Sequence, residues 1–241
     1  MLSRTAATGS PRHRRVAAVV RWPVGLAAVS WRYLWRTTPV HRVEEPGDGG
    51  DEAPELPAEV VDDRVQLAAD GHGDLLHRRY EVSVEDSRLG PEELIGALTS
   101  DFNGWFPTGV AVFRRTRGEQ GTCAVGDEFL IRLPGPWDGP VRVVTSGPDG
   151  FRFATLGGHL EAGQIEFRAA RDGDRLLVTI ESWARPGDAV SQLLYDRLRL
   201  AKEIQLNLWT EVLLRIAKLT GGAVRGGVRV HTRRLAATPA A

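Results

Sequence analysis

The feature that most constrains this chain is a long stretch near its C-terminal end that has helical periodicity and one apolar face. It runs from about Asp188 to Leu219, follows Pro186-Gly187 and stops before Gly221-Gly222, which are the signals expected at helix boundaries. At 1.5 Å per residue the predicted helix is roughly 48 Å long. Its apolar stripe consists of Val190, Leu194, Leu198, Ala201, Ile204, Leu208, Val212, Ile216 and Leu219. Such a helix must lie against another apolar surface.

A series of strand-like segments upstream supplies that surface. Residues 78–86 alternate apolar and polar side chains, which predicts a strand, and Pro91-Glu92-Glu93 opens a predicted helix that ends near Ser100. After Pro107 come six further strand-like segments, at residues 110–115, 124–133, 141–145, 151–156, 164–170 and 175–183. Turn residues such as Pro148-Asp149-Gly150 separate them. The pattern predicts an antiparallel meander of seven strands with one apolar face, which the C-terminal helix covers.

Charge divides the N-terminal part of the chain into two segments, although the net charge of the whole chain is zero. Residues 1–43 contain eight arginines and no acid, whereas residues 44–63 contain nine acids and no base. Because the acidic segment is also rich in Pro and Gly, residues 44–74 are predicted to be a linker. The folded domain is then predicted at residues 75–222, and residues 223–241 are predicted to be a disordered tail.

Several classes of protein are disfavoured by composition. Cys123 is the only cysteine, so an intramolecular disulfide is excluded and a cysteine-based metal site is disfavoured. No apolar run reaches the roughly 20 residues of a membrane span or forms a secretion signal. The 29 arginines against two lysines are typical of a GC-rich coding sequence and do not indicate nucleic-acid binding. We therefore expect a cytoplasmic protein without a metal, a cofactor or a nucleic-acid partner.

The N-terminal segment 24–36 carries an amphipathic pattern. Its apolar side includes Trp31 and Trp35, with Arg32 and Arg36 beside them. Tryptophan and arginine next to an apolar face are typical of a helix on an anionic membrane surface. Docking on the domain itself or on a partner protein fits the same pattern, so peripheral contact with the inner membrane surface is one of three hypotheses.

The stretch Thr155-Leu156-Gly157-Gly158-His159-Leu160-Glu161-Ala162-Gly163, followed by Glu166-Phe167 and Ser182-Trp183-Ala184-Arg185-Pro186, resembles an uncharacterised bacterial family. That family has a T-L-x-G-H-x-E-x-G motif and is related to START and Bet v 1-like proteins. The resemblance covers about residues 77–220 and implies a helix-grip fold, in which a curved sheet wraps a C-terminal helix and leaves a cavity. This chain has Gly157 and Leu160 where the family more often has proline, which implies a more flexible loop.

His159 and Glu161 are the first candidate site residues, and two interpretations remain open. They are either an acid/base or ligand-binding pair at the cavity mouth, or polar side chains that hold a glycine-rich hairpin closed. A metal site is disfavoured because His-x-Glu offers only two ligands.

A second group of candidates lies on the predicted helix and around the predicted cavity. Gln205 interrupts the apolar stripe, so it is either the polar contact of an apolar ligand pocket or a residue bonded to the sheet backbone or to water. Trp105 and Phe106 follow the first helix and either stack on a ligand or close one end of the core. Phe153 and Phe167, on predicted strands, complete the expected ligand-binding set.

The sequence thus predicts an α+β helix-grip domain that binds a hydrophobic small molecule or lipid, without catalysis. Two alternatives remain. One is a cyclase, hydrolase or isomerase that uses His159 and Glu161. The other is a structural or regulatory domain with a packed interior and no ligand.

Overall fold

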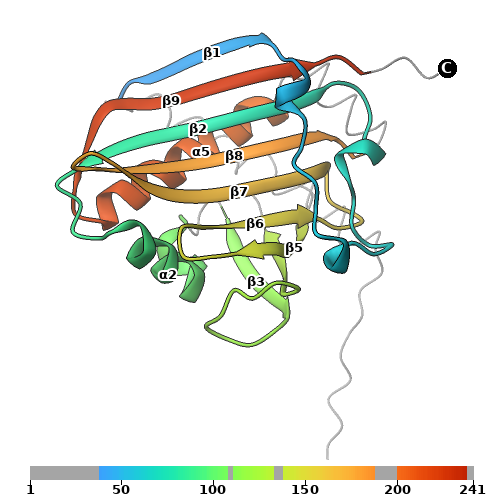
Figure 1. Ribbon diagram of the computed structural model, residues 1–241, viewed down its shortest axis with the longest axis horizontal. Helices are drawn as coiled ribbons and strands as arrows, with labels where there is room; N and C mark the ends of the chain where they lie inside the picture. The colour runs from blue at the N-terminus through green and yellow to red at the C-terminus, as the bar shows by residue number, and fades with distance from the viewer. Residues whose placement is uncertain (1–37, 108–110, 133–137, 188–199, 238–241) are drawn as a thin grey trace, which may run out of the picture.

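The computed structural model describes residues 38–107, 111–132, 138–187 and 200–237, with side chains described from Gln205 onward in the last range. These residues form one sheet of nine strands in the order β1-β9-β2-β8-β7-β6-β5-β4-β3 (Figure 1). Strands β1 and β9 run parallel, and every other neighbouring pair is antiparallel. The strands are β1 (Val40–Pro46), β2 (Leu75–Glu85), β3 (Val112–Arg117), β4 (Glu128–Arg132), β5 (Asp138–Ser146), β6 (Gly150–Thr155), β7 (Glu161–Asp172), β8 (Arg175–Pro186) and β9 (Ala223–Leu235).

Three α-helices within the described ranges accompany the sheet. Helix α2 (Pro91–Ser100) has the predicted bounds, and the Glu93 carboxylate accepts a hydrogen bond from the Gly90 amide at 2.7 Å at its start. Helix α3 (Phe102–Trp105) follows directly. Helix α5 (Leu200–Leu219) lies against β2, β8 and β9 (Figure 1). We call the face of the sheet that α5 covers the inner face and the opposite face the outer face.

The hydrophobic core lies between the inner face and the helices. From the sheet it contains the alternating residues Tyr80, Val82 and Val84 of β2, and from α5 it contains Val212 and Ile216, all buried. Strand residues two apart point to the same face, so the period-2 pattern of β2 supplies one side of the core. The helical pattern of α5 supplies the other side, as the sequence indicates.

The number of strands differs from the prediction. The seven predicted strands correspond to β2–β8, but β1 and β9 extend the sheet beyond β2. The prediction of a disordered tail is wrong for Ala223–Leu235, because β9 pairs with β2 along most of its length. Val228 and Val230 are buried, while Arg229 between them is exposed. This alternation is a short strand signal within a segment whose small residues and arginines resemble a solvated tail.

The predicted linker also differs from the structure. Its first residues belong to β1, and three short 3-10 helices, η1 (Gly49–Asp51), η2 (Ala58–Val60) and η3 (Ala68–Asp70), follow. Its acids pair with bases far away in sequence: Asp62 with Arg142 at 2.9 Å and Asp51 with His77 at 2.8 Å. Acidic, Pro- and Gly-rich composition predicts a solvated chain, but here Asp51 and Asp62 pair with basic side chains of the sheet. We call residues 47–74 the acidic strap.

Two of the predicted helices include residues that the structure does not describe. Helix α5 ends at Leu219 as predicted, whereas residues 188–199 lie outside the described residues. The segment 24–36, with Trp31, Arg32, Trp35 and Arg36, lies outside them as well. Among the described helices, none combines the length and apolar character needed to cross a membrane.

Candidate functional site

The glycine-rich loop from Thr155 to Gly163 joins β6 to β7. The Nδ1 atom of His159 lies 2.9 Å from the amide nitrogen and 3.0 Å from the carbonyl oxygen of Glu161. In one tautomer Nδ1 accepts from the Glu161 amide, and in the other it donates to the Glu161 carbonyl. The imidazole therefore holds the backbone of the hairpin, which is the structural interpretation of this motif.

The surroundings of His159 disfavour the protonated, charged form of its imidazole. Desolvation lowers its pKa to about 4, and the hydrogen bond to the Glu161 backbone opposes this shift. The ring lies over Gly139 on β5, where a Cβ atom would come within 2.9 Å of His159 Nε2. His159 is thus neutral at neutral pH, which makes it a weak proton acceptor there.

A chain of polar side chains crosses the inner face beneath α5. The guanidinium of Arg78, on β2, donates from Nη1 to the Gln205 Oε1 atom. The Gln205 amide donates in turn from Nε2 to Glu161 Oε2 at 3.0 Å. Gln205 therefore joins β2 to the start of β7. The structure brings together two predicted site residues, Gln205 and Glu161, with one that was not predicted, Arg78.

The electrostatics of this Arg78–Gln205–Glu161 chain are those of a desolvated site. Desolvation raises the pKa of Glu161, while the Arg78 charge and the Gln205 hydrogen bond oppose the shift. The phenol of Tyr80, next on the inner side of β2, also has a raised pKa because it is buried, and Arg78 opposes that shift. Burial disfavours charge on both acids, and Arg78 supplies the compensating positive charge.

Arg78 and Tyr80 were missed as site residues, although the sequence contains a signal for Arg78. The inner side of β2 reads Leu76, Arg78, Tyr80, Val82, Val84. A charged residue in the apolar phase of a strand is rarely buried without a partner. Its position therefore marks a buried polar site, but nothing in the sequence indicates that its partner is Gln205.

The predicted aromatic ligand residues lie in the core. All seven phenylalanines of the chain form one cluster, and within it Phe106, Phe153 and Phe167 expose only 0%, 1% and 3% of their surface. Phe167 stacks on Phe151, and Phe106 packs edge-on against Phe113. The three side chains pack against other phenylalanines of the cluster and therefore have almost no surface available for a ligand. Trp105 is half-buried at the edge of this cluster, and its carbonyl accepts a hydrogen bond from Arg215.

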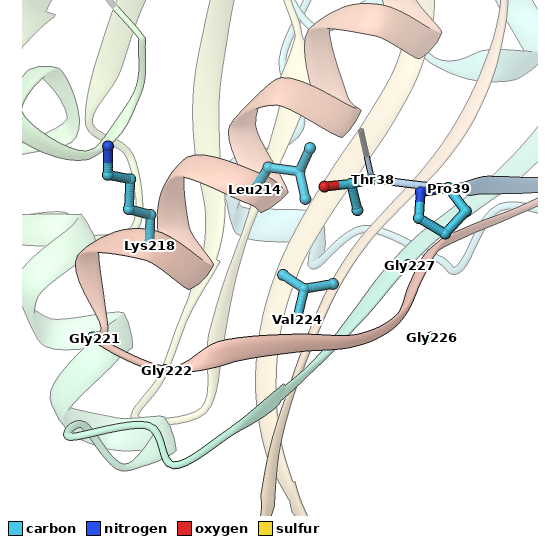
Figure 2. Close-up of a pocket in the computed structure, with 9 residues that line it drawn as sticks. All are labelled: Thr38, Pro39, Leu214, Lys218, Gly221, Gly222, Val224, Gly226 and Gly227. Carbon is cyan, nitrogen blue, oxygen red and sulfur yellow. The ribbon is translucent and has the colours of Figure 1, made fainter. Parts of the chain in front are cut away.

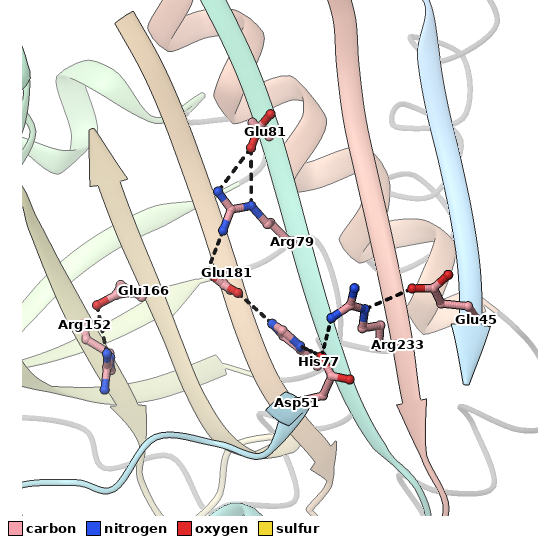
Figure 3. A network of polar contacts seen from close by, with 9 residues as sticks. All are labelled: Glu45, Asp51, His77, Arg79, Glu81, Arg152, Glu166, Glu181 and Arg233. Carbon is pink, nitrogen blue, oxygen red and sulfur yellow. Dashed lines mark hydrogen bonds and ion pairs between the residues drawn. The ribbon is translucent and has the colours of Figure 1, made fainter. Parts of the chain in front are cut away.

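The outer face carries a different polar network (Figure 3). His77 lies between two carboxylates, with Nδ1 2.8 Å from Asp51 and Nε2 2.7 Å from Glu181. Arg233 also binds Asp51, at 3.0 Å. Desolvation acts against the pairing, but hydrogen bonds from the Asp48 amide, Arg233 and His77 lower the pKa of Asp51 to about 2. The Glu181 and Asp51 contacts raise the pKa of His77 against its own desolvation. This network fastens the acidic strap to the sheet.

A pocket of about 590 Å³ lies beside the C-terminal end of α5 (Figure 2). It is lined by Leu214 and Lys218 of α5, by Val224, Gly226 and Gly227 of β9, and by Thr38 and Pro39, and the Leu214 side chain lies above Val224. None of the predicted site residues lines this pocket. Within the described ranges, no group of three or more His, Cys, Asp or Glu side chains is arranged to hold a metal ion.

These observations define a class: an α+β protein in which a large, mostly antiparallel sheet carries a helix on one face and a desolvated polar chain beneath that helix. A family model described as "Domain of unknown function (DUF1990)" matches residues 66–212, and the chain belongs to this family. No curated protein matches the chain.

Several solved structures resemble the chain at low identity. A solution NMR structure from Thermobifida fusca is 15% identical over 60% of this chain and 93% of its own, with a TM-score of 0.43. The crystal structure of Ara h 8.0201 is 13% identical over 60% and 97%, with a TM-score of 0.43. A hypothetical protein from Helicobacter pylori is 11% identical over 59% and 86%, with a TM-score of 0.44.

Proposed function

We propose that this domain is a helix-grip protein that binds an apolar small molecule or a lipid between the inner face of the sheet and α5. The observation that carries the proposal is the Arg78–Gln205–Glu161 chain beneath the helix. Small-molecule sites are commonly apolar spaces with a few convergent polar groups that fix orientation. The inner face supplies both kinds of group at this position.

The accessibility of neighbouring side chains supports the same position. Ile165 points to the inner face of β7, in the row of residues that contains Ser182 and Arg78. It is half-buried, whereas Phe167 and Ala169 further along the same side of β7 are buried. Glu161 and Gln205 are also half-buried. Groups that are desolvated and yet keep accessible surface are typical of the lining of a binding site.

The enzymatic alternative, with His159 and Glu161 as an acid/base pair, has less support. The hydrogen bonds of the imidazole go to the backbone of Glu161, and the Glu161 carboxylate accepts from Gln205. A histidine with a pKa of about 4 is also poorly matched to proton transfer at neutral pH. The ligand-free alternative is distinguished by experiment.

The test uses the full chain. Native mass spectrometry is expected to detect a bound apolar compound after gentle purification. Thermal denaturation with methyl laurate or phosphatidylcholine is expected to show stabilisation, which is about 2.7 kcal/mol when the free ligand is at 100 times its Kd. No adduct together with no shift for any apolar probe would refute the binding function and favour the structural alternative.

A variant that fills the proposed site makes the test specific. Ile165→Trp adds volume at a half-buried inner position and is expected to abolish the ligand-induced shift while the protein still folds. Val112→Trp is the matched control, because Val112 is an exposed residue on the edge strand β3. Equal shifts in both variants would place the ligand elsewhere, and the 590 Å³ pocket beside Val224 would be the next site to test.

We further propose that segment 24–36 contacts an anionic membrane surface, an inference that rests on the sequence pattern of Trp31, Arg32, Trp35 and Arg36. The full chain is expected to sediment with vesicles that contain phosphatidylglycerol and to stay in solution with pure phosphatidylcholine vesicles. The double variant Trp31→Ala/Trp35→Ala is expected to lose this binding. Sedimentation that this variant leaves unchanged would exclude the segment as the membrane contact.

A further inference from the structure

Arg78 has an unused hydrogen-bond donor in the interior of the protein. The residue is only 5% exposed. Its Nη1 atom donates to Gln205, and the guanidinium also interacts with the neighbouring Tyr80 phenol. Its Nη2 atom is buried and has no hydrogen-bond partner. A guanidinium offers five N–H donors and no acceptor. Leaving a buried donor of a charged group unpaired is costly, so the missing partner must be a hydrogen-bond acceptor.

Trp209 carries a second unused donor on the same side of α5. It lies one helical turn after Gln205 and therefore on the same helix face. The residue is 8% exposed, its ring packs edge-on against Phe167 with centroids 5.7 Å apart, and its Nε1 atom has no hydrogen-bond partner. Indole, like guanidinium, is a donor only. Both unpaired groups therefore require a hydrogen-bond acceptor as their partner.

The charge of the Arg78–Gln205–Glu161 chain selects among acceptors. The Gln205 amide links the Arg78 guanidinium to the Glu161 carboxyl group by two hydrogen bonds, so Arg78 already has one acidic partner in this chain. Arg42, the other cation whose charge reaches Tyr80, is exposed to solvent on β1, where its field is screened. A second carboxylate would then be buried without its own counter-charge, which is unfavourable. An uncharged acceptor avoids this cost.

We propose that the bound molecule carries an uncharged acceptor oxygen, such as a ketone, quinone or ester carbonyl, which is bound by Arg78 Nη2, with Trp209 Nε1 as a second donor toward the same molecule. This inference rests on the proposed function, that an apolar ligand occupies the space under α5. It adds the chemical class of the ligand: an apolar compound with carbonyl oxygen, in preference to a hydrocarbon or a carboxylic acid.

The experiment compares three probes of similar length by isothermal titration calorimetry at neutral pH with the full chain. Methyl laurate has an uncharged carbonyl, lauric acid has a carboxylate, and tridecane has no oxygen. Methyl laurate is expected to bind at least about 10-fold more tightly than either of the others, the size of one hydrogen bond to a charged donor. Equal affinity for methyl laurate and tridecane overturns the inference and leaves the binding function intact.

The remaining probe outcomes are also decisive. Tighter binding of lauric acid would show that the site prefers an anion and would overturn the uncharged class. No binding of any of the three probes would refute the binding function itself, and the inference with it. The failure of the inference and the failure of the proposed function are therefore distinguishable in one data set.

Variants of Arg78 and Trp209 test whether these two donors cause the preference for methyl laurate over tridecane. Trp209→Phe keeps a ring and removes Nε1, and it is expected to lower the ratio of methyl laurate to tridecane affinity about 3-fold or more. Arg78→Lys keeps the charge and removes the second donor arm, with an expected loss of about 10-fold in the same ratio. Trp183→Phe is the matched control, because Trp183 stacks on His77 at the outer face. If Arg78→Lys does not fold, Trp209→Phe still decides, since an unchanged ratio there removes the indole from the site.

Discussion

Neighbouring residues of β2 take part in two polar networks that differ in completeness. His77 points to the outer face, where both ring nitrogens meet a carboxylate within 2.8 Å. Arg78 points to the inner face, where one guanidinium nitrogen binds Gln205 and another has no partner. Buried polar groups in native proteins are normally satisfied. Both ring nitrogens of His77 are paired, as expected for a residue that stabilises the fold. The guanidinium of Arg78 keeps an unpaired donor, as expected for a residue of a binding site without its ligand.

The two networks also differ in what they connect. The outer network joins the acidic strap to strands that are distant in sequence, since Asp51 binds both His77 of β2 and Arg233 of β9. The inner chain joins two strands to a helix through one amide, Gln205. Loss of an outer contact should therefore lower the free energy of unfolding, whereas loss of an inner contact should change ligand affinity.

The largest effect is expected at Gly163, where a side chain on β7 would collide with the backbone of β8. Gly163 has a φ of +152°, and a Cβ atom there would lie 2.0 Å from the backbone oxygen of Trp183. Trp183 carries the ring that stacks on His77 outside, and Glu161 is two residues from Gly163. Gly163→Ala is expected to lower the free energy of unfolding by about 3 kcal/mol or more, because backbone cannot move aside cheaply.

The control for this prediction is in the same loop. A Cβ atom at Gly157 would meet nothing closer than the Arg64 carbonyl at 3.8 Å, so Gly157→Ala is expected to change the free energy of unfolding by less than about 0.5 kcal/mol. Urea denaturation measures both variants. Similar losses at the two glycines would mean that β7 and β8 do not approach as closely as the structure has them.

A smaller effect is expected from the outer network alone. Asp51→Asn removes the charge that His77 and Arg233 bind and is expected to lower the free energy of unfolding by about 1–2 kcal/mol at neutral pH. Because the pKa of Asp51 is lowered from 3.8 to about 2, its contribution is present above pH 3.8 and is lost as the pH falls through about 2. The variant should lack this acid-dependent loss in urea denaturation curves measured across that range.

Glu52→Gln is the matched control for Asp51→Asn, since it removes one negative charge from the next residue, which is exposed. It is expected to leave both the stability and its pH dependence unchanged within about 0.5 kcal/mol. Ligand affinity should also be unchanged in Asp51→Asn. A variant that folds stably but loses affinity for methyl laurate would show that the two faces are coupled, contrary to the separation of roles.

Local sequence patterns predicted the central part of the fold, while contacts between distant segments escaped them. The period-2 pattern of β2 and the helical stripe of α5 are local. A strand forms at Leu75–Glu85, and the part of the predicted helix that the structure describes, Leu200–Leu219, is helical. The acidic strap and β9 were missed because each is stabilised by partners more than 25 residues away, such as Asp51 with His77. Within the site, Gln205 was visible as a polar residue in the apolar stripe and Glu161 as the neighbour of His159 in the glycine-rich loop. Their bond across 44 residues has no signature in sequence.

The smallest effect on the free energy of unfolding is expected at Gly139, and it tests whether His159 packs against β5 or is available to a ligand. Gly139→Ala would place a Cβ atom 2.9 Å from His159 Nε2, and the ring is held by the Glu161 backbone. The expected loss is about 1 kcal/mol. In a His159→Ala background the clash is gone, and alanine in place of glycine in a strand should then be neutral or stabilising by about 0.5 kcal/mol. Urea denaturation of the four proteins gives the coupling energy. A cost for Gly139→Ala that persists without the imidazole would show that His159 does not fill this space, and the ring would return as a candidate for ligand contact.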